Sequence, residues 1–181
     1  MAMVWSSLVQ PNLVLGGSVF DLSPDLLHRH NLKGVILDVD DTLVPLRQVE
    51  SDPDLIAWMT GIKAVGKVWL VSNNVNGSRI KRIANALEVP YLTSAGKPSR
   101  RKLKQALEAM DLPPEQVAMV GDRLLTDVLA GNRLGLFTIL VDPMPNLDQD
   151  QPRFSLLRTL EVALLRAMGI SLSAPPPPSQ P

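Results

Sequence analysis

Two carboxylates separated by one apolar residue, Asp38 and Asp40, follow a short apolar run in the segment VILDVDDTLVP. Two neighbouring carboxyl groups tend to have different pKa values, so that one stays ionised while the other carries a proton. This division predicts Asp38 as a nucleophile and Asp40 as a general acid and then a general base. Attack on a phosphate monoester is one reaction that such a pair could carry out.

A carboxylate that approaches a phosphate monoester meets charge repulsion, so such a site needs cations. Asp122 and Asp127 in the segment GDRLLTD are candidate metal ligands, and oxygen ligands without His or Cys favour a hard ion, Mg²⁺ over zinc. The ion would neutralise the phosphoryl oxygens and orient them for attack. Ser72 could donate its hydroxyl to the same group, and Lys97, in AGKP, could place an ammonium against it.

Short apolar runs alternate with amphipathic segments along the chain, which predicts βαβ units with right-handed crossovers and a parallel sheet covered on both faces. Ligands bind beyond the carboxyl ends of the strands in such sheets. Asp38, Ser72 and Asp122 each follow an expected strand, so these side chains are expected to meet at one edge. The strands are expected at residues 34–37, 68–71, 89–92, 117–120 and 136–141, and the helices at 24–30, from 53 onward, and at 79–87, 99–110, 126–133 and 154–168.

The four pieces, in this order, resemble the motifs of the haloacid dehalogenase (HAD) superfamily of phosphotransferases over about residues 33–142. DVDDTLV resembles the first motif, Ser72 after an apolar strand the second, Lys97 the third and GDRLLTD the fourth. The resemblance implies a Rossmann-like, three-layer α/β sandwich and a covalent aspartyl-phosphate on Asp38. Asp40 implies a phosphatase or phosphomutase, because the dehalogenases and ion-pumping ATPases of the superfamily lack an acid there.

The resemblance also implies how the work of the site is divided. Mg²⁺ is expected on the carboxylates of Asp38 and Asp122 and on the backbone carbonyl of Asp40, with Asp127 in the ligand shell, often through water. The residues expected to hold the phosphoryl group are Ser72, Asn73, Lys97 and the backbone of Asp40 and Asp41.

The two gaps in which members of this superfamily usually insert a cap domain are short here. About two dozen residues separate Val44 from the second strand, and a similar number separate Asn74 from Lys97. A capless site is open, which suits a large or membrane-borne ester and argues against a phosphomutase, since a phosphomutase must keep water from the phospho-enzyme. The leader QPNLVLGGSVFDLSPDLL and the context LKGVILDVDDTLVP resemble the YqeG-type branch of subfamily IIIA, which is similar to phosphatidylglycerophosphate phosphatases. The resemblance implies a role in phospholipid metabolism, with phosphatidylglycerol phosphate as the leading substrate.

Two alternatives to this function stay open. One is the same chemistry directed at a nucleotide, sugar or protein phosphate. A catalytically idle fold used as a binding or regulatory module is the other alternative, and the presence of Asp38, Asp40, Lys97 and Asp122 argues against it.

The composition fits one domain at residues 1–170, with its core at about 33–142 and a Pro-rich, unfolded tail at 171–181. Eighteen basic residues balance eighteen acidic ones, so no nucleic-acid partner is expected, and the lack of cysteine excludes thiolate chemistry. The start of the chain lacks the basic region of a secretory signal, and no apolar run reaches the ~18 residues that span a bilayer, which predicts a cytoplasmic protein. The sequence makes no prediction of the oligomeric state.

Peripheral contact with a membrane stays open through two features. The first is a run of basic residues at 100–104, together with Arg79, Lys81 and Arg82, which could attract anionic headgroups or be an ordinary charged helix face. The second is the wide apolar stripe of the helix expected at 154–168. That stripe could dock on the sheet or lie in a membrane interface.

Overall fold

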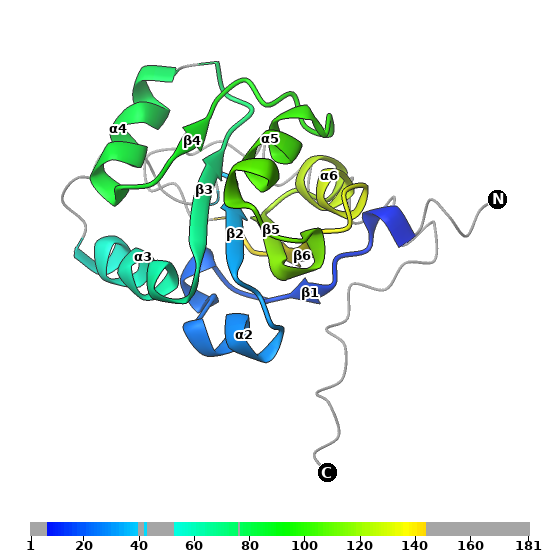
Figure 1. The fold of residues 1–181 in the computed structure, drawn as a ribbon, viewed down its shortest axis with the longest axis horizontal. Helices are drawn as coiled ribbons and strands as arrows, with labels where there is room; N and C mark the ends of the chain where they lie inside the picture. Colours follow the sequence, from blue (N-terminus) through cyan, green and yellow to red (C-terminus); the bar gives the residue numbers. More distant parts are fainter. Residues whose placement is uncertain (1–6, 40–41, 43–52, 76, 144–181) are drawn as a thin grey trace, which may run out of the picture.

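The computed structural model describes residues 7–39, 42, 53–75 and 77–143 of the 181-residue chain. These residues build one open, parallel sheet of six strands in the order β1-β6-β5-β2-β3-β4, with helices packed against both faces (Figure 1). The predicted α/β architecture with a parallel sheet is therefore confirmed. Between β2 and Lys97 only residues 40–41, 43–52 and 76 lie outside the described part, too few for a cap domain.

The strands agree with the predicted apolar runs, apart from one additional short strand in the leader. They are β1 (Leu13–Val14), β2 (Gly34–Leu37), β3 (Lys67–Val71), β4 (Tyr91–Leu92), β5 (Val117–Gly121) and β6 (Phe137–Leu140). The helices are η1 (Val19–Asp21), α2 (Pro24–Arg29), α3 (Pro53–Val65), α4 (Gly77–Leu87), α5 (Arg101–Met110), η3 (Pro114–Gln116), η4 (Leu124–Val128) and α6 (Leu129–Asn132).

Alternation of side chains along the strands divides the core into two layers. In β2, Val35 and Leu37 join the layer that also contains the buried side chains of α2, α3 and α4, whereas Ile36 joins the layer beneath α5 and α6. All four residues of β2 are buried, as a continuous apolar run in the middle of a parallel sheet requires. Burial on both faces holds the carboxyl end of β2, and with it Asp38, in a fixed position.

The leader supplies an edge strand of the sheet. β1 pairs in parallel with β6, and Asn12 fixes the register through its side chain. Its Oδ1 accepts a hydrogen bond from the Thr138 backbone N–H at 2.8 Å, and its own N–H donates to Thr138 Oγ1 at 3.1 Å. Asn132 Nδ2 donates to the carbonyls of Leu8 and Gln10 at 2.8 and 2.9 Å. These bonds attach residues 8–12 to the sheet and to the end of α6.

The segment after β5 differs from the single helix predicted at residues 126–133. It opens with η4, a wide π-type turn in which the N–H of Leu129 donates to the carbonyl of Leu124, and it continues as the short α6. Such turns are rare and occur often at functional sites. The helix expected at 154–168 and the tail at 171–181 lie outside the described residues. Over the described part of the chain, no helix has the length and apolar character needed to cross a membrane.

Candidate active site

A buried ion-pair cluster lies at the carboxyl edge of the sheet, with Lys97 at its centre. The Lys97 ammonium is 2.6 Å from Asp38 Oδ1 and 2.6 Å from Asp127 Oδ1. It also donates a hydrogen bond to the carbonyl of Val71, the last residue of β3, at 3.2 Å. The side chains of Lys97 and Asp127 are each 1% exposed and that of Asp38 is 6% exposed. Residues 38, 97 and 127, far apart in the sequence, therefore form one water-excluded group.

The electrostatics of this cluster keep the lysine charged. Burial lowers the pKa of Lys97, but the carboxylates of Asp127 and Asp38 outweigh that effect and hold this pKa above its usual range. Burial raises the pKa of Asp38 well above its usual value, and the nearby Asp127 and Asp122 carboxylates add to the rise while Lys97 opposes it. One ammonium thus faces more than one carboxylate, and the cluster carries an excess of negative charge.

A divalent cation fits this excess of negative charge. Asp38, Asp122 and Asp127 each offer a carboxylate oxygen, and the three oxygens lie within 4.8 Å of one another. The donor set contains only oxygen, which suits a hard ion such as Mg²⁺. The half-buried Asp122 is oriented by Thr42, whose hydroxyl donates to Asp122 Oδ1 at 3.2 Å.

Asp127 is positioned by the wide turn η4 and by the glycine that ends β5. Its Oδ2 accepts a hydrogen bond from the backbone N–H of Arg123 at 3.3 Å, while its other oxygen contacts Lys97. A Cβ atom on Gly121 would overlap Asp127 Oδ2, at a separation that real side chains essentially never show. Only glycine at position 121 lets the carboxylate lie against the backbone here.

Lys97 is held through its backbone by Asn73, which follows β3. The Asn73 amide accepts from the Lys97 N–H at 2.8 Å through Oδ1 and donates to the Lys97 carbonyl at 3.2 Å through Nδ2. This paired contact fixes the peptide from which the ammonium extends. The neighbouring Ser72 is fully buried, and its Oγ accepts from the N–H of Asn74 at 2.9 Å.

The structure brings together most of the residues that the sequence singled out. Asp38, Lys97, Asp122 and Asp127 form the cluster, and Ser72 and Asn73 follow β3 directly beside it. The phosphate-binding roles of Ser72 and Asn73 stay predictions. Asp40 and Asp41 lie outside the described residues, so their assigned roles also stay predictions.

Two residues of the site were missed by sequence reasoning. Thr42 orients Asp122, and Gly121 makes room for Asp127. Both stand inside motifs that had been singled out, DVDDT and GDRLLTD, so their position was the available signal. Thr42 contacts Asp122 of the other motif, and Gly121 meets Asp127 within its own motif through the wide turn η4; spacing reveals neither contact.

Comparison with known proteins agrees with this geometry. A HAD-hydrolase-like family model matches residues 94–143. The chain is 40% identical over 152 residues to the probable phosphatase YqeG of Bacillus subtilis (strain 168), covering 83% of this chain and 87% of that protein. It is 30% identical over 138 residues to the chloroplastic phosphatidylglycerophosphate phosphatase 1 of Chlamydomonas reinhardtii; the match covers 67% of this chain but only 51% of that longer relative. A crystal structure of a hypothetical protein from Xanthomonas campestris shares the fold, with a TM-score of 0.50 and 19% identity over 70% of this chain and 78% of that one.

The parallel sheet and the acidic cluster at its carboxyl edge thus occur in a chain whose sequence relatives are phosphatases. The chain belongs to the haloacid dehalogenase superfamily, within its YqeG-type phosphatases. The predicted superfamily, branch and enzyme class are confirmed. The predicted similarity to phosphatidylglycerophosphate phosphatases is also found, at 30% identity.

Proposed function

We propose that this phosphatase hydrolyses a phosphate monoester through a covalent aspartyl-phosphate on Asp38, that it requires Mg²⁺, and that its leading substrate is phosphatidylglycerol phosphate. The observation that carries the proposal is the placement of the Lys97 ammonium 2.6 Å from both Asp38 and Asp127. A buried cation beside a carboxylate at the open edge of a sheet can offset the charge of an incoming phosphoryl group.

In the first step, a carboxylate oxygen of Asp38 attacks phosphorus and the bond from phosphorus to the ester oxygen breaks. The leaving alcohol takes its proton from Asp40, and Asp38 carries the phosphoryl group. In the second step, a water molecule gives its proton to Asp40 and attacks the same phosphorus, which releases inorganic phosphate and restores Asp38. In both steps the negative charge on the phosphoryl oxygens changes beside the Lys97 ammonium. Because the Lys97 side chain is buried, its attraction for these oxygens is stronger than it would be in water.

The acidic cluster would hold the metal ion through Asp38 and Asp122, with Asp127 beside them. When bound, Mg²⁺ supplies neutralisation of phosphoryl charge. The residues of this chain set the rest of the geometry. Thr42 orients Asp122, Asn73 holds the Lys97 peptide, and Gly121 lets Asp127 approach the ammonium.

The lipid substrate is supported by two observations of different kinds. One relative, 30% identical to this chain, is named a phosphatidylglycerophosphate phosphatase. The segments between β2 and Lys97 are also too short to hold a cap domain, so an ester embedded in a bilayer would meet no covering domain. A small metabolite would gain less from such a site, because no cap domain inserted between β2 and Lys97 would exclude water around it.

Phosphate release from a panel of esters tests the proposal. The substrates are phosphatidylglycerol phosphate in mixed micelles, a nucleoside monophosphate, a sugar phosphate and a phosphopeptide, each assayed with Mg²⁺ and with excess chelator. We expect the fastest release from the lipid, its loss on chelation, and its recovery on addition of Mg²⁺. Brisk release from the nucleotide without release from the lipid would assign a different substrate. Release that is unaffected by chelation would remove the metal from the mechanism.

A further inference from the structure

The large apolar side chains that are exposed share one edge of the molecule. In the described ranges these are Ile56, Val75 and Leu125, which are 41%, 83% and 36% exposed. Val75 follows the end of β3 and Leu125 follows the end of β5, so both lie at the carboxyl edge of the parallel sheet. Ile56 lies in the first turn of α3, which starts at that edge because the helix leads back to the start of β3. Single exposed apolar residues are ordinary, but Val75 and Leu125 follow strands that end at the edge carrying Asp38, and Ile56 lies in a helix that starts there.

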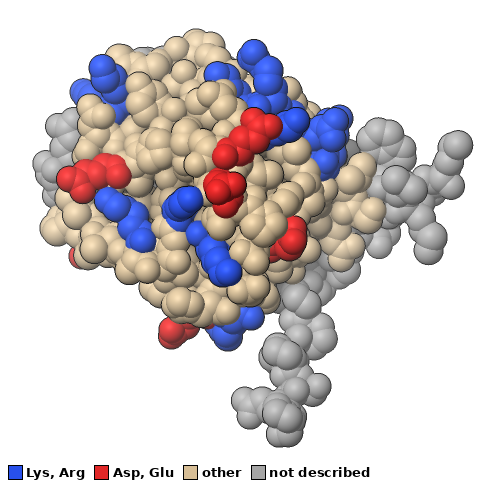
Figure 2. All heavy atoms as spheres, viewed as in Figure 1, with Lys and Arg blue, Asp and Glu red and all other residues tan. Residues whose placement is uncertain are grey.

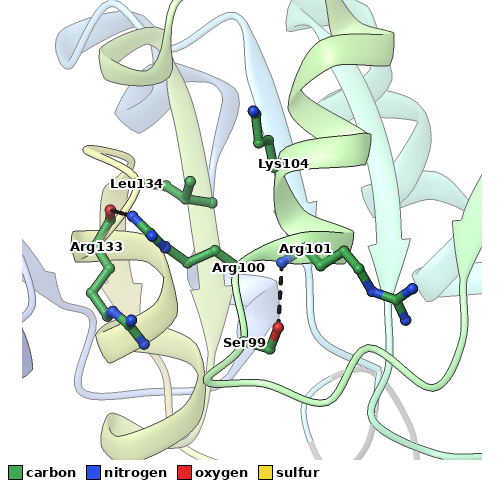
Figure 3. A pocket seen from close by; sticks show the side chains of 6 residues that line it. All are labelled: Ser99, Arg100, Arg101, Lys104, Arg133 and Leu134. Carbon is green, nitrogen blue, oxygen red and sulfur yellow. Dashed lines mark hydrogen bonds between the residues drawn. The ribbon is translucent and has the colours of Figure 1, made fainter.

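A basic pocket lies between the start of α5 and the end of α6. Its volume is about 550 Å³, and it begins at Ser99, close in the chain to Lys97. Figure 3 shows Arg100 extending from the start of α5 toward Arg133 and Leu134, with Lys104 further along the helix and Arg101 extending to the other side. The residues that line this Arg100 pocket are Ser99, Arg100, Arg101, Lys104, Arg133 and Leu134.

The arginines of the pocket are held by neutral carbonyl groups. Arg100 Nη1 donates to the Arg133 carbonyl at 3.3 Å, and Arg133 Nη1 donates to the Pro98 carbonyl at 3.2 Å. Over the described residues neither guanidinium pairs with a carboxylate, and Lys104 has only an exposed contact with Glu108 at 3.6 Å. A guanidinium bonded to a carbonyl keeps its full charge and its remaining donors, so each can still bind a phosphate oxygen.

The start of α5 adds to this attraction for an anion. Its first turn contains no acidic residue, and its N-cap, Arg100, makes no capping hydrogen bond through its side chain. The positive end of the helix dipole therefore adds to the charge of the lysine and arginines, which repel one another until an anion binds. Figure 2 shows Lys and Arg side chains around the region where Figure 1 draws α5, with acidic side chains between them.

We propose that this edge docks onto an anionic lipid bilayer, with Ile56, Val75 and Leu125 entering the interface and the Arg100 pocket taking the phosphate of an anionic headgroup. The inference rests on the proposed function, because a phosphatase for a lipid-borne ester must bring Asp38 to the bilayer surface. Apolar side chains beside a basic pocket complement the boundary between acyl chains and anionic headgroups. The contact places the cluster around Lys97 against the lipid phosphates.

Co-sedimentation of the full chain with vesicles tests the proposal, using phosphatidylcholine vesicles with and without phosphatidylglycerol. The pocket variant is Arg100→Gln/Lys104→Gln, and Val75→Ser probes the apolar contact. Arg133 is left intact because its guanidinium contacts Pro98, next to Lys97. The charge-matched control is Arg29→Gln/Lys33→Gln, which removes two exposed cations that precede β2 at the opposite edge of the sheet.

We expect the wild type to prefer the anionic vesicles. Each cation at an anionic surface contributes about fivefold to partitioning, so the pocket variant should bind about 25-fold more weakly while the control changes by less than about threefold. Val75→Ser should weaken binding by about fivefold, with or without phosphatidylglycerol, wherever binding of the wild type is measurable. Equal losses in the pocket variant and the control, or no binding by the wild type, would overturn the proposal. Binding of inorganic phosphate in the pocket without binding of vesicles would overturn its assignment to a lipid.

Turnover of para-nitrophenyl phosphate separates this inference from the proposed function. The wild type, the pocket variant and the control should hydrolyse this soluble ester at the same rate with Mg²⁺, because none of the changed residues contacts the cluster around Lys97. Failure of the proposed function would appear as an inactive wild type. Failure of the docking inference would appear as an active wild type whose vesicle binding does not depend on Arg100 and Lys104.

Discussion

Lys97 and the arginines of the Arg100 pocket, which starts two residues after Lys97, have opposite surroundings. Lys97 is buried between Asp38 and Asp127, and every polar contact of its ammonium is to the protein. Arg100 and Arg133, in contrast, are exposed and are held by carbonyl groups without a carboxylate partner among the described residues. The first arrangement fixes a charge where chemistry takes place, and the second leaves charge available to a ligand from outside.

The difference also concerns stability. A buried ion pair gains little net stability over an apolar pair of similar size, but removal of one partner leaves an uncompensated charge and is costly. Exposed charges can be changed with little effect on the fold. Substitutions near Lys97 should therefore alter activity and stability together, whereas substitutions around the Arg100 pocket should alter neither turnover of soluble substrates nor the fold.

Lys97→Met should have the largest effect. It removes the ammonium and leaves Asp38 and Asp127 buried without their cation. We expect kcat to fall by about 10³-fold and the free energy of unfolding to fall by about 3–5 kcal/mol. Turnover of a soluble ester and urea denaturation measure the two quantities. The matched control is Lys67→Met, which loses one hydrogen bond to the carbonyl of Met110 and should lose no more than about 1.5 kcal/mol. Normal turnover by Lys97→Met would show that the buried cation takes no part in the reaction.

Gly121→Ala should have the next largest effect, because the added Cβ would overlap Asp127 Oδ2. The carboxylate has to move away from Lys97, so we expect kcat to fall by about 10²-fold and the free energy of unfolding to fall by about 1–3 kcal/mol. Gly61→Ala is the control, since a Cβ there meets only Pro24 Cγ at 3.6 Å and alanine favours the helix by up to about 1 kcal/mol. If both variants behave alike, close packing at Gly121 does not position the site.

Thr42→Val should act on the metal requirement more than on the fold. It removes the hydroxyl that donates to Asp122 Oδ1, and loss of such a partner lowers metal affinity by about tenfold or more. The Mg²⁺ concentration for half-maximal activity should rise accordingly, and Thr42→Ser should restore it. An unchanged Mg²⁺ dependence in Thr42→Val would mean that the hydroxyl does not orient a metal ligand.

Glu108→Gln should have the smallest effect, and it tests whether an exposed charge can be removed with little change in stability. Among the described residues Glu108 pairs with Lys104 alone, and both side chains are about two-thirds exposed, at 65% and 66%. We expect the free energy of unfolding to change by less than about 0.5 kcal/mol and soluble turnover to stay the same. Thermal denaturation and the para-nitrophenyl phosphate assay check this. A loss of stability well above that value would mean that the Lys104–Glu108 pair makes a substantial contribution to the stability of the fold.

The sequence predicted the fold well where a local pattern carried the information. Continuous apolar runs located β2, β3 and β5, and the polar residues after them predicted one shared edge. Asp38, Asp122 and Lys97 meet there as expected. β2 and β5 are buried along their whole length, so a short apolar run bounded by polar residues is an informative signal there.

The remaining features depend on contacts between distant residues. β1 is too short to show a pattern, and its place is set by Asn12 bonding to Thr138 far along the chain. The wide turn η4 brings Asp127 to Lys97, which a helical spacing rule does not predict. The Arg100 pocket likewise joins Arg100 to Arg133, residues on different helical segments. Tertiary packing decides such arrangements, and no local propensity reveals them.

Trapping of the covalent intermediate tests the central claim most directly. The protein is mixed briefly with substrate and Mg²⁺, treated with hydroxylamine, and digested for mass spectrometry of the peptide that contains residue 38. The account predicts a hydroxamate on Asp38 in the wild type, and neither this adduct nor phosphate release in Asp38→Asn, which should keep its fold by circular dichroism. An adduct on another residue, or undiminished phosphate release by Asp38→Asn, would contradict it.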